Sequence, residues 1–102
     1  MSKEKIKQSV RQAIKTDPNK KDIVRISLFG SHAYGRPKAD SDVDLLIEFK
    51  PKAKIGFFEL FDTRDNLEKH LNKKVDLLTP GDLSKYFRDE VLKKAEKIYE
   101  RK

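Results

Sequence analysis

The 102-residue sequence contains no cysteine. It therefore has no disulfide framework, no thiolate metal site and no cysteine nucleophile. It also lacks an apolar run long enough to cross a membrane, and its N-terminus is charged rather than typical of a signal peptide. We therefore expect a soluble, cytoplasmic protein without membrane contact, folded as one domain over residues 1–102.

Apolar residues are also scarce, at 36% of the sequence, whereas charged residues make up 40%. This balance favours a compact core, with a small sheet covered by amphipathic helices. The formal charge of +7 raises the question of nucleic-acid binding. However, the lysines and arginines are spread along the chain among acidic residues, which is typical of a solvated surface. We therefore do not expect specific nucleic-acid binding, although the basic charge could steer a nucleotide to a site.

Hydrophobic periodicity predicts helices at 3–15 and 57–72, strands at 23–29, 43–49 and 74–79, and a long helix from Asp82 to the end. The short connection predicts an antiparallel first pair, and the crossover predicts that the third strand runs parallel to the second. The fold class is thus α+β: a small mixed β-sheet, in the order helix-strand-turn-strand-helix-strand-helix, with flanking helices. The aromatic residues of the middle helix are expected to anchor the core. The last helix should turn five residues inward: Leu83, Phe87, Val91, Ala95 and Ile98.

The stretch from Phe29 to Glu48 carries the candidate chemistry. Asp42 and Asp44 are two residues apart at the start of a strand, so their side chains should project on the same face. Such a carboxylate pair favours a hard divalent cation, above all Mg²⁺. Gly30 allows a sharp turn, and Ser31 offers a hydroxyl and an amide suited to phosphate.

Gly30-Ser31, ten residues, then Asp42-x-Asp44 resembles the signature of the polymerase-β-like nucleotidyltransferase superfamily. The fuller run Gly-Ser-x-Ala-x-Gly…Ser-Asp-x-Asp-Leu is similar to its minimal nucleotidyltransferase (MNT) branch. The resemblance implies the nucleotidyltransferase fold. The competing interpretation, a surface hairpin whose aspartates only mark a turn, fits poorly with the hydrophobic residues that follow Asp44.

Asp76 occupies the second position of the predicted third strand, much as Asp44 does in its own. Parallel neighbours in register would bring the two carboxylates together, and the resemblance implies the same third acidic residue. The alternative is a solvent-facing polar residue at a strand start. The resemblance thus implies Asp42, Asp44 and Asp76 as catalytic and metal-binding residues holding two Mg²⁺ ions.

The same resemblance implies a phosphate-binding half of the site at Gly30 and Ser31. His32 stands where the family most often has arginine, and Arg36 lies near the second glycine of the motif. Either residue could contact phosphate or belong to an exposed loop. We carry both as candidate nucleotide-binding residues.

The predicted function follows from the MNT resemblance. Relatives of this branch are antitoxins of HEPN/MNT toxin–antitoxin pairs, and the implied reaction is Mg²⁺-dependent transfer of AMP from ATP to a hydroxyl, expected to be a tyrosine, of a partner HEPN toxin. Because the chain ends soon after the predicted core, we expect the acceptor to come from another chain in a hetero-oligomer. Two alternatives remain: a non-catalytic antitoxin that neutralises a HEPN ribonuclease by masking it, and a nucleotide- or RNA-binding domain.

Overall fold

The computed structural model of the chain describes residues 2–34 and 42–101. Its elements are α1 (Lys3–Lys15), a 3₁₀ turn η1 (Lys20–Asp22), β1 (Ile23–Phe29), α2 (Ser31–Tyr34), β2 (Val43–Phe49), α3 (Phe57–Leu71), β3 (Val75–Leu78), a 3₁₀ turn η2 (Pro80–Asp82), α4 (Arg88–Lys94) and β4 (Glu96–Glu100). Within the described ranges, no helix is both long enough and apolar enough to span a bilayer.

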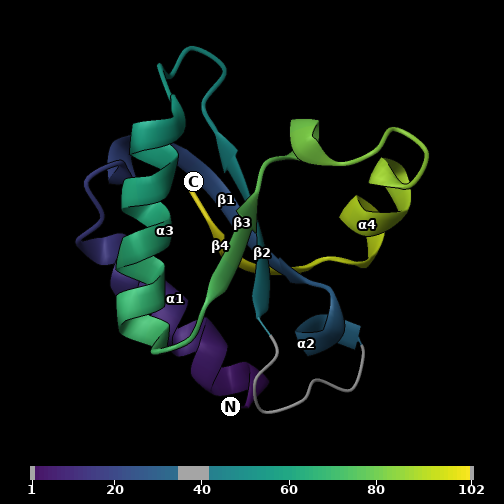
Figure 1. Cartoon of the computed structure of the whole chain (residues 1–102), viewed down its shortest axis with the longest axis horizontal. Helices are drawn as coiled ribbons and strands as arrows, with labels where there is room; N and C mark the ends of the chain where they lie inside the picture. The colour runs from purple at the N-terminus through teal and green to yellow at the C-terminus, as the bar shows by residue number, and fades with distance from the viewer. Residues whose placement is uncertain (1, 35–41, 102) are drawn as a thin grey trace.

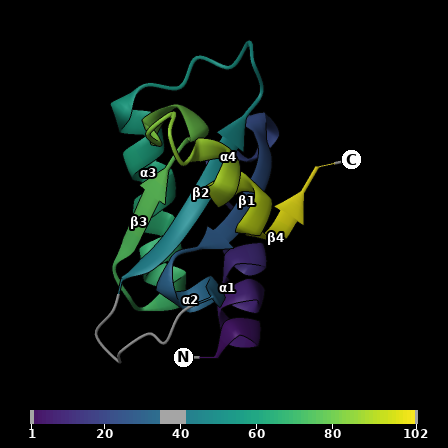
Figure 2. The same ribbon diagram turned by 90° about the vertical axis from the view of Figure 1, so that its right-hand side faces the viewer.

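The strands of the described residues form one mixed sheet in the order β3-β2-β1-β4. β1 pairs with β2 in antiparallel orientation, and β3 runs parallel to β2, so both strand-pairing predictions are confirmed. Figure 1 shows α1 and α3 on one side of the sheet and α4 on the other. Figure 2 shows the strands from the α4 side, with β2 and β1 in the middle.

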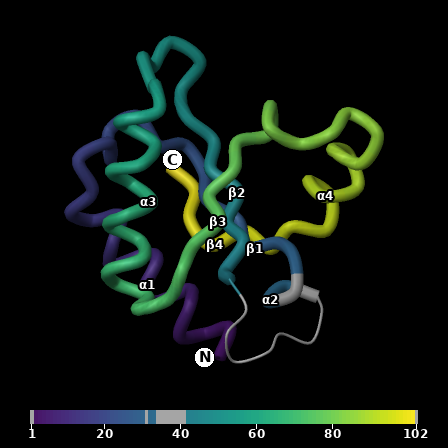
Figure 3. The backbone as a smooth tube through the Cα atoms, viewed as in Figure 1, coloured from purple at the N-terminus to yellow at the C-terminus, as the bar shows by residue number. Residues whose placement is uncertain are grey.

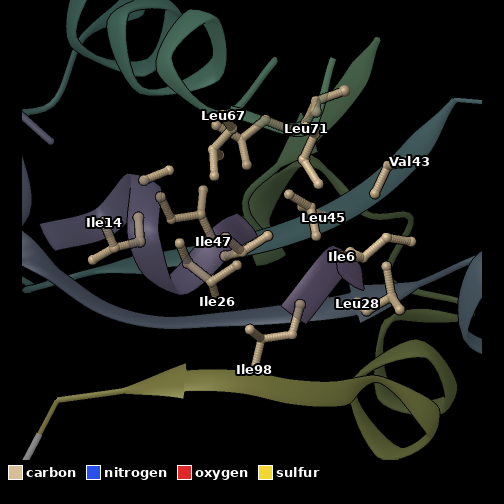
Figure 4. Packing of buried hydrophobic residues seen from close by; sticks show 14 of the residues in the cluster. Ile6, Ile14, Ile26, Leu28, Val43, Leu45, Ile47, Leu67, Leu71 and Ile98 are labelled. Atoms are coloured by element: carbon tan, nitrogen blue, oxygen red, sulfur yellow. The ribbon is translucent and has the colours of Figure 1, made fainter. Parts of the chain in front are cut away.

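The hydrophobic core lies between the sheet and the pair of helices α1 and α3 (Figure 4). α1 has the predicted bounds and buries its apolar stripe, while the Ser2 hydroxyl caps its start by accepting from the Lys5 amide. α3 ends as predicted near Asn72, which adopts a left-handed conformation. The strands contribute alternate side chains to the same layer, which includes Ile26, Leu28, Val43, Leu45 and Ile47. The apolar side chains that the helical and strand periodicities predicted to face inward therefore pack in one core.

The prediction of a long C-terminal helix is wrong. The chain after β3 forms the turn η2, then the short helix α4, and ends in the strand β4. Asp82 does not cap a long helix, because its carboxylate accepts from the amide and hydroxyl of Thr79 within η2. β4 pairs antiparallel with the free edge of β1 and buries Ile98. Figure 3 follows this return of the backbone from α4 along β1.

The prediction that the aromatic residues of α3 anchor the core is also wrong. Phe57 is 78% exposed and Phe61 is 42% exposed. The fully buried positions of α3 lie further along the helix, at Thr63, Leu67 and Leu71. The rings of Phe57 and Phe61 therefore lie largely in solvent, although Leu60 in the same part of α3 packs against the core.

Candidate active site

Gly30, Asp44 and Asp76 lie side by side at one end of the sheet. Asp44 of β2 is opposite Phe29, the last residue of β1, and pairs with Asp76 on its other side in β3. Neighbouring strands are about 4.8 Å apart, so the two aspartates begin from adjacent backbone positions. α2 follows directly after Gly30 at this same end of the sheet (Figure 2). The predicted juxtaposition of Asp44 and Asp76 is thus present in the fold.

Gly30 is in close contact with Asp44. Its φ is +73°, a conformation that side-chain-bearing residues rarely adopt. A Cβ at this position would lie 2.9 Å from Cγ of Asp44 and overlap its carboxylate oxygen Oδ2. Only glycine therefore lets β1 turn into α2 while Asp44 occupies the space beside it.

Asp44 is the titrating group at the centre of this arrangement. Its side chain is half-buried, whereas Asp42 and Asp76 are exposed. Burial, and then the negative charges of Asp76 and Asp42, raise the pKa of Asp44 above its ordinary value. All three carboxylates therefore share one electrostatic environment, in which a bound cation would favour the charged form of Asp44.

The donor set suits a hard cation, although the carboxylates do not enclose one. Over residues 2–34 and 42–101, no three acidic or histidine side chains converge as a complete set of metal ligands. The oxygen donors are those that Mg²⁺ prefers, and a magnesium site usually combines one or two carboxylates with waters and substrate phosphates. The residues thus fit a magnesium ion held jointly with a nucleotide.

Two hydrogen bonds fix the strand starts that carry the aspartates. The amide of Val43 donates to the carbonyl of Lys74 at 3.0 Å, which joins the beginning of β2 to the residue before β3. The carboxylate of Glu68, on α3, accepts from the amide of Val75 at 2.8 Å. Sequence reasoning missed Glu68, because nothing in the helical pattern shows that its side chain accepts a hydrogen bond from the first residue of β3, seven residues further along the chain.

The other predicted residues meet different outcomes. Ser31 begins α2, but its side chain and all of Arg36 lie outside the described part of the molecule. His32 is buried, with 7% of its surface exposed, and bonds to the backbone of Asp42. Burial, followed by the charge of Lys73, lowers the pKa of His32, which favours a neutral imidazole. His32 therefore packs under the site beside Asp42.

A hollow lies beyond Asp44, on the face of the sheet that is turned toward α4. It has a volume of about 410 Å³ and lies between the sheet and α4. Leu46 and Glu48 of β2 line it, together with Ser27 of β1. Since residues two apart on a strand share a face, the hollow begins one position further along the face that presents Asp44. A substrate bound at the acidic pair thus has space beside it.

Comparison with known proteins identifies the family of this chain. Residues 11–102 match the family model described as polymerase beta, nucleotidyltransferase. The chain belongs to this nucleotidyltransferase family. The family and the fold confirm the class of protein that the motif predicted.

Individual relatives place the chain within the family. It is 38% identical over 74 residues, or 72% of this chain and 74% of the other, to a candidate protein adenylyltransferase of Methanocaldococcus jannaschii. Its fold matches the structure of a candidate minimal nucleotidyltransferase with a TM-score of 0.75 and 29% identity, covering 93% of this chain and 94% of the other.

A third match shows a shared fold at lower identity. It is the complex of a tri-AMPylated HEPN toxin with its MNT antitoxin from Shewanella oneidensis, with a TM-score of 0.64. The identity is 18%, and the match covers 94% of this chain and 73% of the other. The fold found here therefore also occurs in that toxin–antitoxin complex.

Proposed function

We propose that this protein transfers AMP from ATP to a hydroxyl group of a partner protein, and that the partner is a HEPN toxin. The observation that carries the proposal is the row of Gly30, Asp44 and Asp76 at the end of the sheet. Protein adenylyltransferase is also the name given to the M. jannaschii relative, and AMP is the group carried by the HEPN toxin of the Shewanella complex. We infer that the reaction takes place in the cytoplasm.

Each residue of the site has a role in this reaction. Asp42, Asp44 and Asp76 would hold two Mg²⁺ ions, which would supply charge stabilisation for the triphosphate and for the leaving pyrophosphate. Ser31, with the amides around Gly30, would hold the outer phosphates. The hollow between the sheet and α4 would give the nucleoside room beyond Asp44. His32, buried beside Asp42, would support the nucleotide-binding site from there, and Arg36 would contact phosphate.

The proposed chemical step is a nucleotidyl transfer, in which one P–O bond forms and one breaks, and no oxidation or reduction takes place. The hydroxyl oxygen of the acceptor, which we take to be tyrosine, attacks the α-phosphorus, and its proton passes to Asp76 and then to water. The bond from the α-phosphorus to the bridging oxygen breaks in line, and pyrophosphate leaves. Asp76 is exposed, so an acceptor arriving from solvent can reach it. The products are an AMP phosphodiester on the partner and pyrophosphate.

The decisive experiment uses ATP labelled at the α-phosphate, Mg²⁺ and the purified HEPN protein proposed as the partner. Label should move to a tyrosine of the HEPN protein, whereas label at the γ-phosphate should not. Asp44→Asn should reduce transfer by several orders of magnitude, because it removes charge stabilisation from the transition state. Asp76→Asn should also abolish transfer but leave nucleotide binding largely intact.

The competing function is neutralisation by masking. In that case the wild-type protein would silence the HEPN protein without transferring label, and Asp44→Asn would silence it equally well. The placement of the half-buried Asp44 beside Asp76 favours catalysis, because crowded carboxylates with a raised pKa occur preferentially at functional sites. Silencing by Asp44→Asn with no transfer by wild type would therefore reject the enzymatic proposal.

A further inference from the structure

Three phenylalanines at the beginning of α3 expose their rings to solvent. Phe57 is 78% exposed, Phe58 is 82% exposed and Phe61 is partly exposed. Because aromatic rings gain free energy when they are removed from water, their exposure here is unfavourable for the isolated chain. Contiguous exposed apolar surface often marks a site of interaction with another molecule. We call these three residues the aromatic patch.

A groove adjoins the aromatic patch. It has a volume of about 290 Å³ and lies between the start of α3 and the turn η2. Its lining is mainly apolar, with two polar residues at η2: Ile55, Gly56, Phe57, Leu60, Thr79 and Asp82. A small apolar groove beside exposed aromatic rings is the kind of pocket into which a protein partner inserts an anchoring side chain.

Charge around the patch indicates which partner fits. The loop just before it carries three exposed lysines, Lys50, Lys52 and Lys54. Of the nearby acidic residues, Glu59 accepts from the amide of Gly56 at 2.6 Å, Asp82 accepts from Thr79, and Asp65 pairs with Arg64. Asp62 is a further exposed carboxylate, so the three lysines lie beside acidic groups that are mostly engaged within the chain. A second copy of this chain would bring lysines against lysines. The rim therefore favours an acidic partner over self-association.

The geometry of the rings favours protein over nucleic acid. Phe57 and Phe61 are stacked on each other, with centroids 6.1 Å apart and planes 27° apart. The guanidinium of Arg64 also lies over the Phe61 ring, 4.6 Å from its centroid. A base-binding platform needs free ring faces. Phe57, Phe61 and Arg64 thus occupy part of one another's surfaces, and this leaves fewer free ring faces for stacked bases than three separate rings would offer.

We propose that the aromatic patch and its groove are the docking site for the acceptor protein, which presents an apolar side chain flanked by carboxylates. This inference rests on the proposed function, which requires a protein acceptor. The patch follows the Phe49 end of β2, whereas Asp44 is near the other end, about 17 Å away along the strand. Docking there leaves the catalytic end open, and the acceptor hydroxyl reaches Asp44 from a separate part of the partner.

Binding of the purified HEPN protein to Phe58→Ala, measured by calorimetry without nucleotide, tests the docking site. Tyr86→Ala is the matched control, because Tyr86 is similarly exposed, at 85%, but lies in the segment before α4. We expect Phe58→Ala to weaken binding about thirtyfold or more, as for an interface hot spot. Tyr86→Ala should bind within about threefold of wild type, and Asp44→Asn should bind as wild type does.

Charge and activity provide two further readouts. Lys52→Glu together with Lys54→Glu should weaken binding and reduce its dependence on salt. In the labelled-ATP assay, Phe58→Ala should raise the KM for the HEPN protein and leave kcat near wild type. Equal melting temperatures of the alanine variants would show that the fold is unchanged.

Several results would overturn the docking site. These are wild-type binding by Phe58→Ala, an equal loss in Tyr86→Ala, or absence of HEPN binding by the wild-type chain. A dimer in solution that Phe58→Ala dissociates, or single-stranded RNA binding that Phe58→Ala abolishes, would assign the patch to another occupant. Label transfer with unaltered binding by Phe58→Ala leaves the proposed function intact, whereas weakened binding without any transfer supports docking and rejects the transfer reaction.

Discussion

Replacing Gly30 by alanine should damage both the stability and the site of this protein. The φ of +73° would cost an alanine roughly 1–2 kcal/mol. In addition, the new Cβ would lie 2.9 Å from Cγ of Asp44, so that the carboxylate must move. For a domain of this size, each kcal/mol shifts the melting temperature by about 4–8 °C. We therefore expect a decrease of roughly 5–15 °C, together with loss of nucleotide transfer.

Gly81→Ala is the control for this experiment. A Cβ at Gly81 would meet nothing closer than Oγ1 of Thr79 at 3.8 Å, and Gly81 is not in the left-handed region. Its melting temperature should stay within a few degrees of wild type, with full activity. The assay is thermal unfolding with and without Mg²⁺ and ATP, followed by the labelled-ATP reaction. Wild-type stability and transfer in Gly30→Ala would refute the role assigned to Gly30.

Two further substitutions test the electrostatics and the buried polar network. The raised pKa of Asp44 means that its carboxyl group binds a proton more tightly in the folded state than in the unfolded chain. The metal-free protein should therefore lose stability as the pH rises from about 4 through the raised pKa. Asp44→Asn should remove that loss and melt above wild type in EDTA at pH 7; a lower melting temperature would contradict the assignment. Thr63→Val should cost about 1.5–3 kcal/mol, because the buried Thr63 hydroxyl donates to Asp17 at 2.8 Å. Thr63→Ser keeps the hydroxyl and should cost less in denaturant unfolding, and equal losses would argue against the hydrogen bond.

The first three strands and the row of site residues could be predicted because local pattern and chemistry agree there. In β2, Val43, Leu45 and Ile47 alternate with Asp44, Leu46 and Glu48, and the strand period alone assigns Asp44 to the face opposite Val43 and Leu45. The crossover through α3 then makes β3 a parallel neighbour, which aligns Asp76 with Asp44. These two steps require only the alternation of side chains along a strand and the usual handedness and register of a strand–helix–strand crossover.

The C-terminal segment could not be predicted in this way, because its structure depends on a distant edge. The residues Glu96–Glu100 are too few for a period of two to be distinguished from a period of 3.6. Their pairing with β1 is decided by the unpaired backbone that β1 offers on that side. A bond from Arg11 on α1 to the carbonyl of Ile98 at 3.1 Å further ties this strand to the fold.

The exposed rings of α3 failed prediction for a different reason. The apolar spacing from Phe57 to Leu71 is helical throughout, but in the first turn Leu60 packs against the core while Phe57 and Phe58 stay exposed, and the buried positions of α3 begin at Thr63. Asn19 of the preceding loop donates to the Glu59 carbonyl and to the Thr63 hydroxyl, and thereby fixes where α3 lies along the sheet. Sequence periodicity defines the face of a helix, but it does not define how far along that face the core extends.

β2 combines stability and chemistry in one strand, and its alternation keeps the two apart. Val43, Leu45 and Ile47 are fully buried on the side of α1 and α3, whereas Asp44 lies on the other face with its raised pKa. Substituting an inward residue should therefore reduce activity through unfolding, while substituting Asp44 should reduce activity without destabilising the metal-free protein. Gly30 is the exception, because it serves both the turn after β1 and the space around Asp44.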